Sequence, residues 1–174
     1  MNYGAWVTPE DQRKQNEIAS EIALLMGASL RRQVSKWSTF THELVKNGVT
    51  IAFLAVKDRP QMRTIDAFSR THIMPNYYML GLKRVKRCLS KAWGADVPFL
   101  FGFRTGNGKV YYADLTSAEY IIADMTGRTV QTRDERDIES CAFYSISLFK
   151  PTVEPPQKDE PQEVKPDTNQ GRML

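Results

Sequence analysis

The sequence predicts an α/β fold, in which a small mixed sheet is flanked by helices. Two amphipathic helical patterns, in residues 9–26 and 76–93, stand among short apolar segments of strand character. The order is helix, hairpin, basic helix, hairpin and final strand. This alternation favours helices packed on a sheet over an all-helical or all-β architecture.

The first helix is predicted from residue 9 to Met26. Thr8 can cap it, Pro9 suits its first position, and Gly27 ends it. Glu17 and Glu21 lie one turn apart beside its apolar stripe. Two interpretations of this pair stay open: a solvated flank, or acids that reach a site at the sheet edge.

A hairpin is predicted next. Residues 28–36 are a loop or irregular strand, residues 37–45 a strand, and Asn47-Gly48 a tight turn into a strand over residues 49–57. A two-residue turn would pair Thr41 with Leu54. A three-residue loop centred on Gly48 would set Thr41 against Ala55, and a one-residue change of register reverses side-chain direction.

The remaining elements follow from turn residues and periodicity. We expect a polar loop over residues 58–72, a long helix over 76–93 ended by Gly94, and strands over 97–104 and 109–114 around a turn. A short helix is expected over 117–125, a charged loop over 127–140, and a last strand over 141–147.

The composition is that of a globular protein, with 41% hydrophobic and 25% charged residues. No apolar stretch approaches the roughly 18 residues of a membrane span, and no signal peptide is evident, so we expect an intracellular protein. Cys88 and Cys141 are expected as reduced core residues. His42 and His72 lack zinc-site spacing, so no metal site is predicted from them.

The chain divides by composition into a domain over residues 1–150 and a tail over 151–174. The tail holds five of the nine prolines. Its five acids and three bases give it a net charge of −2, so residues 1–150 carry a net charge of +6 and the whole chain +4. Such a segment is expected to be disordered or extended. It could dock on a protein partner or only increase solubility.

The chain resembles the PD-(D/E)XK nucleases, and in particular the small PD-(D/E)XK-like proteins of bacteriophages, over residues 9–150. The resemblance rests on Ala55-Val56-Lys57 at the strand end, on residues 78–84 followed by 97–101, and on the stretch from Gly127 to Asp137. It implies a restriction-endonuclease-like core. In that family the strand ends in Asp or Glu, any residue, and Lys, whereas here alanine stands at the acidic position.

The resemblance also implies a catalytic arrangement. In the family two carboxylates hold Mg²⁺ and the lysine positions or activates water; here Thr41 and Ala55 occupy the acidic positions and only Lys57 is retained. A methyl group cannot ligate Mg²⁺, which prefers oxygen ligands. Glu21, Glu43 and Asp58 are the acids that could substitute, because a metal responds to where oxygens lie rather than to sequence order.

A second set of candidate residues is basic. Phosphate contacts are expected from the helix and the loop before it, although the surface of an amphipathic helix is commonly charged without such a role. Tyr77 and Tyr78 could stack on bases, but Tyr78 falls on the apolar stripe and is expected in the core. The candidate residues for nucleic-acid binding are Arg59, Arg63, Lys83, Arg84, Lys86, Arg87 and Lys91, with Arg70 as a further loop cation.

Three hypotheses follow. The first is a catalytically inactive nuclease-like phage protein that contacts DNA, RNA or a protein without a cofactor and without a membrane. The second is a divergent Mg²⁺-dependent nuclease with relocated acids. The third is a virion or assembly component whose tail docks on a neighbour, so that either the host cytoplasm or the virion is the expected location.

Overall fold

The structure is a computed structural model that describes residues 8–33, 40–70, 74–126 and 138–153. The helices are α1 (Pro9–Leu25), η1 (Ile65–Arg70), α2 (Leu82–Ala95) and η2 (Ile146–Leu148). The strands are β1 (Ser29–Arg32), β2 (His42–Lys46), β3 (Val49–Arg59), β4 (Tyr77–Gly81), β5 (Phe99–Thr105), β6 (Val110–Asp114), β7 (Ile121–Thr126), β8 (Ile138–Ser145) and β9 (Lys150–Pro151).

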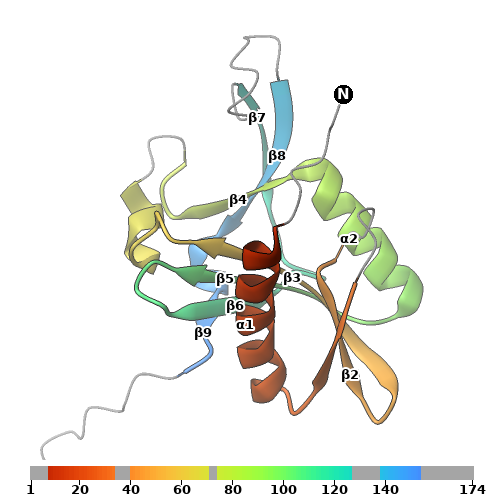
Figure 1. The fold of residues 1–174 in the computed structure, drawn as a ribbon. Helices are drawn as coiled ribbons and strands as arrows, with labels where there is room; N and C mark the ends of the chain where they lie inside the picture. Colours follow the sequence, from red (N-terminus) through yellow and green to blue (C-terminus); the bar gives the residue numbers. More distant parts are fainter. Residues whose placement is uncertain (1–7, 34–39, 71–73, 127–137, 154–174) are drawn as a thin grey trace, which may run out of the picture.

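A six-stranded mixed sheet forms the centre of the fold. Its order is β1-β2-β3-β5-β6-β9, with β3 and β5 parallel and the other neighbours antiparallel. A second, three-stranded sheet has the order β4-β8-β7 (Figure 1). The α/β class and the mixed sheet predicted from the sequence are confirmed.

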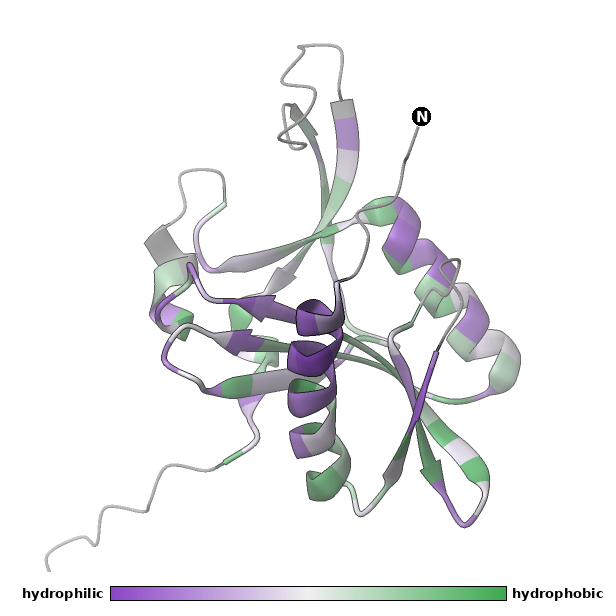
Figure 2. Cartoon of the chain, viewed as in Figure 1, coloured by the Kyte–Doolittle hydropathy of each residue, from purple (hydrophilic) through white to green (hydrophobic). Residues whose placement is uncertain are grey.

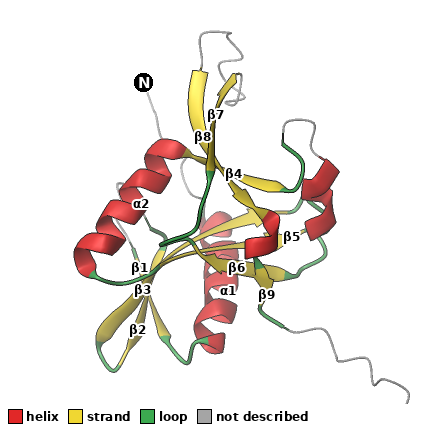
Figure 3. Ribbon diagram, turned by 180° about the vertical axis from the view of Figure 1, so that it is seen from behind, coloured by secondary structure: helices red, strands yellow, loops and turns green. Residues whose placement is uncertain are grey.

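The six-stranded sheet has a core on each face. One face packs on the buried side of α1, and the other packs on α2, β4 and β8. Figure 3, seen from behind, shows α1 and α2 on opposite sides of this sheet. Because side chains alternate along β3, Leu54, Val56 and Asp58 face α1, whereas Phe53, Ala55 and Lys57 face the α2 side.

The sequence of α1 explains both its start and its packing. Thr8 and Asp11 form a reciprocal capping box, and the helix ends at Leu25 with Met26 as its C-cap. Ile18 and Ile22 are fully buried against the sheet. Figure 2 shows hydrophilic residues concentrated in the N-terminal half of α1, so the polar half of this helix lies over the end of β3.

Gly102 on β5 permits the close approach of α1. A Cβ atom at this position would lie 2.4 Å from Cδ1 of Ile22 and 3.5 Å from Cγ1 of Val56. Any larger residue at this position would therefore require the Ile22 side chain, or α1 with it, to shift.

The β2–β3 hairpin combines features of both predicted registers. Its turn has two residues, Asn47 and Gly48, both with positive φ, as a tight hairpin turn requires. The register then shifts between Leu44 and Val45, which leaves Ile51 as the extra residue on β3 and pairs His42 with Leu54. Thr41 lies just before β2, and its backbone N–H donates to the Leu54 carbonyl at 3.0 Å, so the described pairing does not reach Ala55.

Two helix predictions were wrong in part or in whole. Residues 77–81 form β4, because Tyr78 and Leu80 point into the core with the two-residue period of a strand; α2 begins only at Leu82. It ends at Ala95, with Asp96 rather than Gly94 taking the left-handed cap. The predicted helix at 117–125 is replaced by β7, which pairs with β8.

The other boundaries differ less. β3 extends through Arg59 and η1 follows, so residues 58–72 are not a plain loop. β8 begins at Ile138, whereas residues 127–137 of the expected charged loop lie outside the described residues. Cys88 and Cys141 are buried thiols outside any disulfide, and Tyr78 is 1% exposed, as expected. Within the described ranges no helix is both long and apolar enough to cross a membrane.

Candidate functional site

The candidate site lies at the end of β3, where this strand extends past its neighbour. The pairing of β2 with β3 ends at His42 and Leu54, whereas β3 continues to Arg59 and stays paired with β5. The polar half of α1 covers one face of this strand end. Lys57 is half-buried and on the α2 side. The pKa of Asp11, at the start of α1, is lowered mainly by hydrogen bonds from Thr8, with smaller contributions from the charges of Lys14 and then Lys57.

Thr41 and Ala55, which the resemblance predicts at the positions of the family's acids, hold neutral side chains in a packed environment. Ala55 is 0% exposed and belongs to the aromatic core that includes Phe53 and Phe101. The backbone N–H of Thr41 donates to the Leu54 carbonyl at 3.0 Å, and its hydroxyl lies 3.1 Å from the same oxygen. Neither side chain offers an anionic oxygen to a cation.

Asp58 lies on the opposite face from Lys57, in a network of ion pairs with α1. Its carboxylate accepts from Nε of Arg104 at 3.1 Å and lies 3.9 Å from Nζ of Lys14. Nη1 of Arg104 also donates to Glu17 at 2.8 Å. This hydrogen bond is the main cause of the lowered pKa of Glu17, which also pairs with Arg13. Arg104 thus takes the position between two carboxylates.

The two other candidate acids lie elsewhere. Glu43 is on the α2 side of β2, where its carboxylate pairs with Arg31 at 3.1 Å and accepts from the Thr50 hydroxyl at 3.3 Å. Glu21 accepts from the hydroxyl of Thr152, next to β9, at 3.1 Å. The structure therefore does not bring Glu21, Glu43 and Asp58 together. Among the described residues no three His, Cys, Asp or Glu side chains form a group that could hold a metal ion.

His42 is a site residue that the sequence reasoning did not select. It is 1% exposed under α1, with Nε2 2.8 Å from Oδ1 of Asn16 and Nδ1 3.0 Å from the Thr41 hydroxyl. Burial, with a smaller contribution from the charge of Arg32, lowers the pKa of His42 to about 4. The signal in the sequence was its place two residues before Leu44, on the face of β2 that packs on α1.

The candidate basic residues fall into different environments. Arg59 donates from Nε to the Tyr78 hydroxyl at 2.9 Å, and Nζ of Lys91 lies over the stacked rings of Phe40 and Phe53 at 5.6 and 5.5 Å. Arg63 is exposed in the segment before η1. The side chain of Arg70 lies outside the described part. Lys83, Lys86 and Arg87 are exposed on α2 and form no ion pair within the described ranges.

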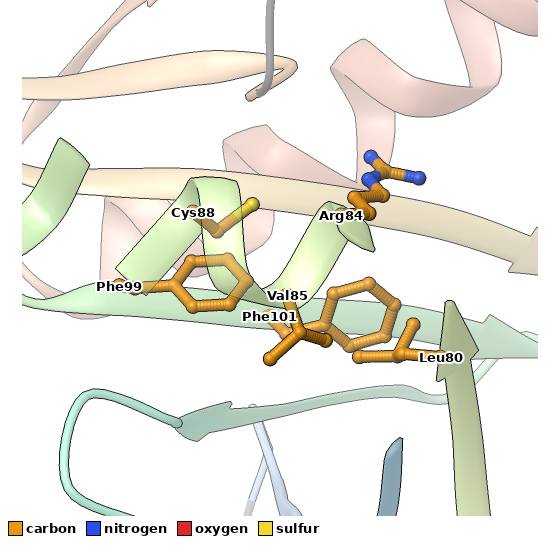
Figure 4. Close-up of a pocket in the computed structure, with 6 residues that line it drawn as sticks. All are labelled: Leu80, Arg84, Val85, Cys88, Phe99 and Phe101. Atoms are coloured by element: carbon orange, nitrogen blue, oxygen red, sulfur yellow. The ribbon is translucent and has the colours of Figure 1, made fainter. Parts of the chain in front are cut away.

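Arg84 borders a narrow apolar pocket under α2 (Figure 4). The pocket is closed by Val85, Phe99 and Phe101 and has no room for a water molecule. The Arg84 guanidinium points away from the two rings. Burial raises the pKa of the adjacent Cys88 thiol to about 11. This pocket is therefore packed core rather than a ligand site.

The fold and the strand end define an α/β protein with a restriction-endonuclease-like core. The comparisons give the particular family: the model described as "Phage putative PDDEXK endonuclease" matches residues 4–152. The chain belongs to this family of nuclease-like phage proteins. Neither the curated proteins nor the solved structures gave a significant match.

Proposed function

We propose that this phage protein is a nuclease-fold module that holds nucleic acid without cutting it. The phosphate backbone of the nucleic acid would contact the exposed cations of α2. The main support for the proposed loss of cleavage is Ala55. Its methyl group is fully buried at the position where the resemblance predicts a carboxylate.

The environment of Lys57 supports this proposal, because the residues present do not fit a Mg²⁺ site. Mg²⁺ needs several oxygen ligands in near-octahedral geometry, and anionic ones offset its dehydration. Glu43 is paired with Arg31, and Asp58 is on the other face with Arg104. With Glu43 and Asp58 held by arginines, we infer that Lys57 acts as a cation that attracts phosphate rather than as part of a metal-dependent centre.

The charge of α2 supports the contact with nucleic acid. The helix carries five cations and no acidic residue between Leu82 and Ala95. Lys83, Lys86 and Arg87 are exposed on it, and each phosphate that they neutralise releases counterions. Such a contact is independent of base sequence and weakens as salt increases.

Binding is tested by fluorescence anisotropy with labelled oligonucleotides over a range of salt concentrations. The triple variant Lys83→Ala, Lys86→Ala, Arg87→Ala should bind more weakly, and its salt slope should fall by about 2 to 3, near one unit per lost phosphate contact. The matched control is Lys46→Ala, Lys109→Ala, Lys150→Ala, which removes the same charge from exposed positions on other elements. An equal loss in both variants would contradict a binding surface on α2.

Cleavage is tested separately, with plasmid and single-stranded DNA in Mg²⁺ or Mn²⁺. We expect no nicks. Reproducible nicking that disappears in Lys57→Ala would overturn the proposed inactivity and restore the hypothesis of a divergent nuclease.

The proposal includes a protein partner for the segment after β9. Pro151 pairs with Tyr111, and Thr152 bonds to Glu21 and to the carbonyl of Val110, so the segment starts from a fixed point on the sheet edge. Limited proteolysis of free and assembled protein tests this part. A tail that is cleaved equally fast in both would exclude docking.

A further inference from the structure

Trp93, near the end of α2, is the side chain on which this inference rests. It is 61% exposed, although indole is among the largest apolar groups that a protein can bury. Lys86, Ser90 and Trp93 follow one another at four- and three-residue spacing, so they lie along one face of the helix. The indole therefore continues the line of exposed cations by about 10 Å beyond Lys86.

The indole is held in place at one edge. Its Nε1–H donates to the carbonyl of Thr116 at 3.3 Å. Thr116 is itself fixed, because its hydroxyl accepts from the backbone N–H of Phe99 at 2.8 Å and lies 2.6 Å from the carboxylate of Asp114. The ring is thus held through its nitrogen, and the exposed remainder is available for contact with a smaller loss of rotamer freedom on binding.

An anchored aromatic face beside a row of cations matches the chemistry of an unpaired nucleotide. The cations bind the phosphates, and a base stacks on the flat ring. Such stacking does not depend on the identity of the base. In a duplex the base faces are already stacked on their neighbours and are not available to a side chain on a helix surface. The other strongly exposed apolar side chains, among them Leu24 on α1 and Ile122 on β7, lie on elements without such a row.

We propose that Trp93 stacks on an unpaired base and that the α2 surface therefore prefers single-stranded nucleic acid. This inference rests on the proposed function, since it names the class of polymer that the same basic face binds. Lys83 and Lys86 supply the attraction to phosphate, and Trp93 supplies the preference for a strand with free bases.

The test compares an oligothymidylate with a duplex of equal length, using the full chain and anisotropy at fixed salt. Trp93→Ala should weaken binding of the single strand about 5- to 100-fold, the range that stacking of one base corresponds to, and change duplex binding by less than about twofold. Trp93→Phe keeps a ring and should retain most of the affinity. Neither variant should change the salt slope, because no charge is removed.

Two controls separate the outcomes. Leu24→Ala removes an apolar side chain that is even more exposed, at 82%, from α1 and should leave both affinities unchanged. Circular dichroism verifies that each variant is folded. If Trp93→Ala binds the single strand as tightly as the unaltered protein, or weakens both polymers equally, the stacking inference fails while the basic surface stands. If the unaltered protein binds neither polymer, the proposed function fails as well.

Discussion

The buried imidazole of His42 and the side-chain amide of exposed Asn16 join β2 to α1 by a hydrogen bond of 2.8 Å. Nη1 of Arg32 donates to the same Oδ1 of Asn16, also at 2.8 Å, so this oxygen accepts and Nε2 of His42 carries a proton. In the neutral ring, Nδ1 is the acceptor and lies 3.0 Å from the Thr41 hydroxyl, whose single hydrogen is shared between this nitrogen and the Leu54 carbonyl at 3.1 Å. The tautomer is assigned from these partners.

This network predicts a pH dependence of stability. The pKa of His42 is about 4 in the folded protein and 6.5 as its ordinary value, so the unfolded chain binds the proton more readily. The contribution is fully present above pH 6.5 and is lost as the pH falls toward 4, with a total of about 3 kcal/mol. Urea unfolding across this range measures it. His42→Gln should be less stable at neutral pH but should lose less on acidification. A His42 resonance that titrates near 6.5 by NMR would contradict this prediction.

Gly102 predicts a packing defect when it is enlarged. Gly102→Ala should destabilise the protein by about 1 to 3 kcal/mol, because its Cβ would overlap Cδ1 of buried Ile22. Ile22→Val removes that atom and should recover part of the loss in the double variant. The control is Gly94→Ala on α2, where nothing lies within 4 Å and a small stabilisation is expected. Thermal unfolding of the four variants decides between overpacking and a general cost of replacing glycine.

Lys91 and Lys86 should behave differently although both are lysines on α2. The ammonium of Lys91 lies over Phe40 and Phe53, so Lys91→Ala should lower stability by about 0.5 to 1 kcal/mol and change nucleic-acid binding little. Lys86→Ala should weaken binding and leave stability nearly unchanged. Denaturant unfolding and anisotropy on the same two variants give the comparison. The reverse pattern would show that Lys91 belongs to the binding surface.

Restoring both acids should create a metal site at the end of β3. Thr41→Asp with Ala55→Glu places an unpaired carboxylate in the core, which should lower stability by a few kcal/mol. Mn²⁺ should then raise the melting temperature, because it binds only the folded form. The isosteric Thr41→Asn with Ala55→Gln is the control without charge. An equal effect of Mn²⁺ on both variants, or no effect on either, would argue against this position for the acids.

The sequence predicted the parts of the fold that local chemistry determines. The capping box at Thr8, the turn at Asn47-Gly48 and the apolar run of β3 each carry their own signal. The bulge at Ile51 has no comparable signal in the residues of the hairpin itself. The helix predicted over residues 117–125 was wrong because good helix formers precede β7 in the sequence, whereas pairing with β8 makes residues 121–126 a strand.

The candidate site was predictable only in part. A lysine at the end of an apolar strand can be read directly from residues 49–57. The separation of Glu43 from Asp58 depends on side-chain direction and therefore on the register, which the hairpin sequence left open. The cation–π contact between Lys91 and Phe40 joins residues 51 positions apart, so no local sequence pattern predicts it.

The short strand β9 has a consequence for how the molecule meets its neighbours. It covers the outer side of β6 with two residues, one of which is Pro151, and proline has no amide hydrogen to offer to a further strand. This edge of the sheet is therefore protected from pairing with a strand of another molecule. Removal of Lys150 and the residues after it would expose the edge of β6 and favour self-association, although the hydrophobic core would stay intact.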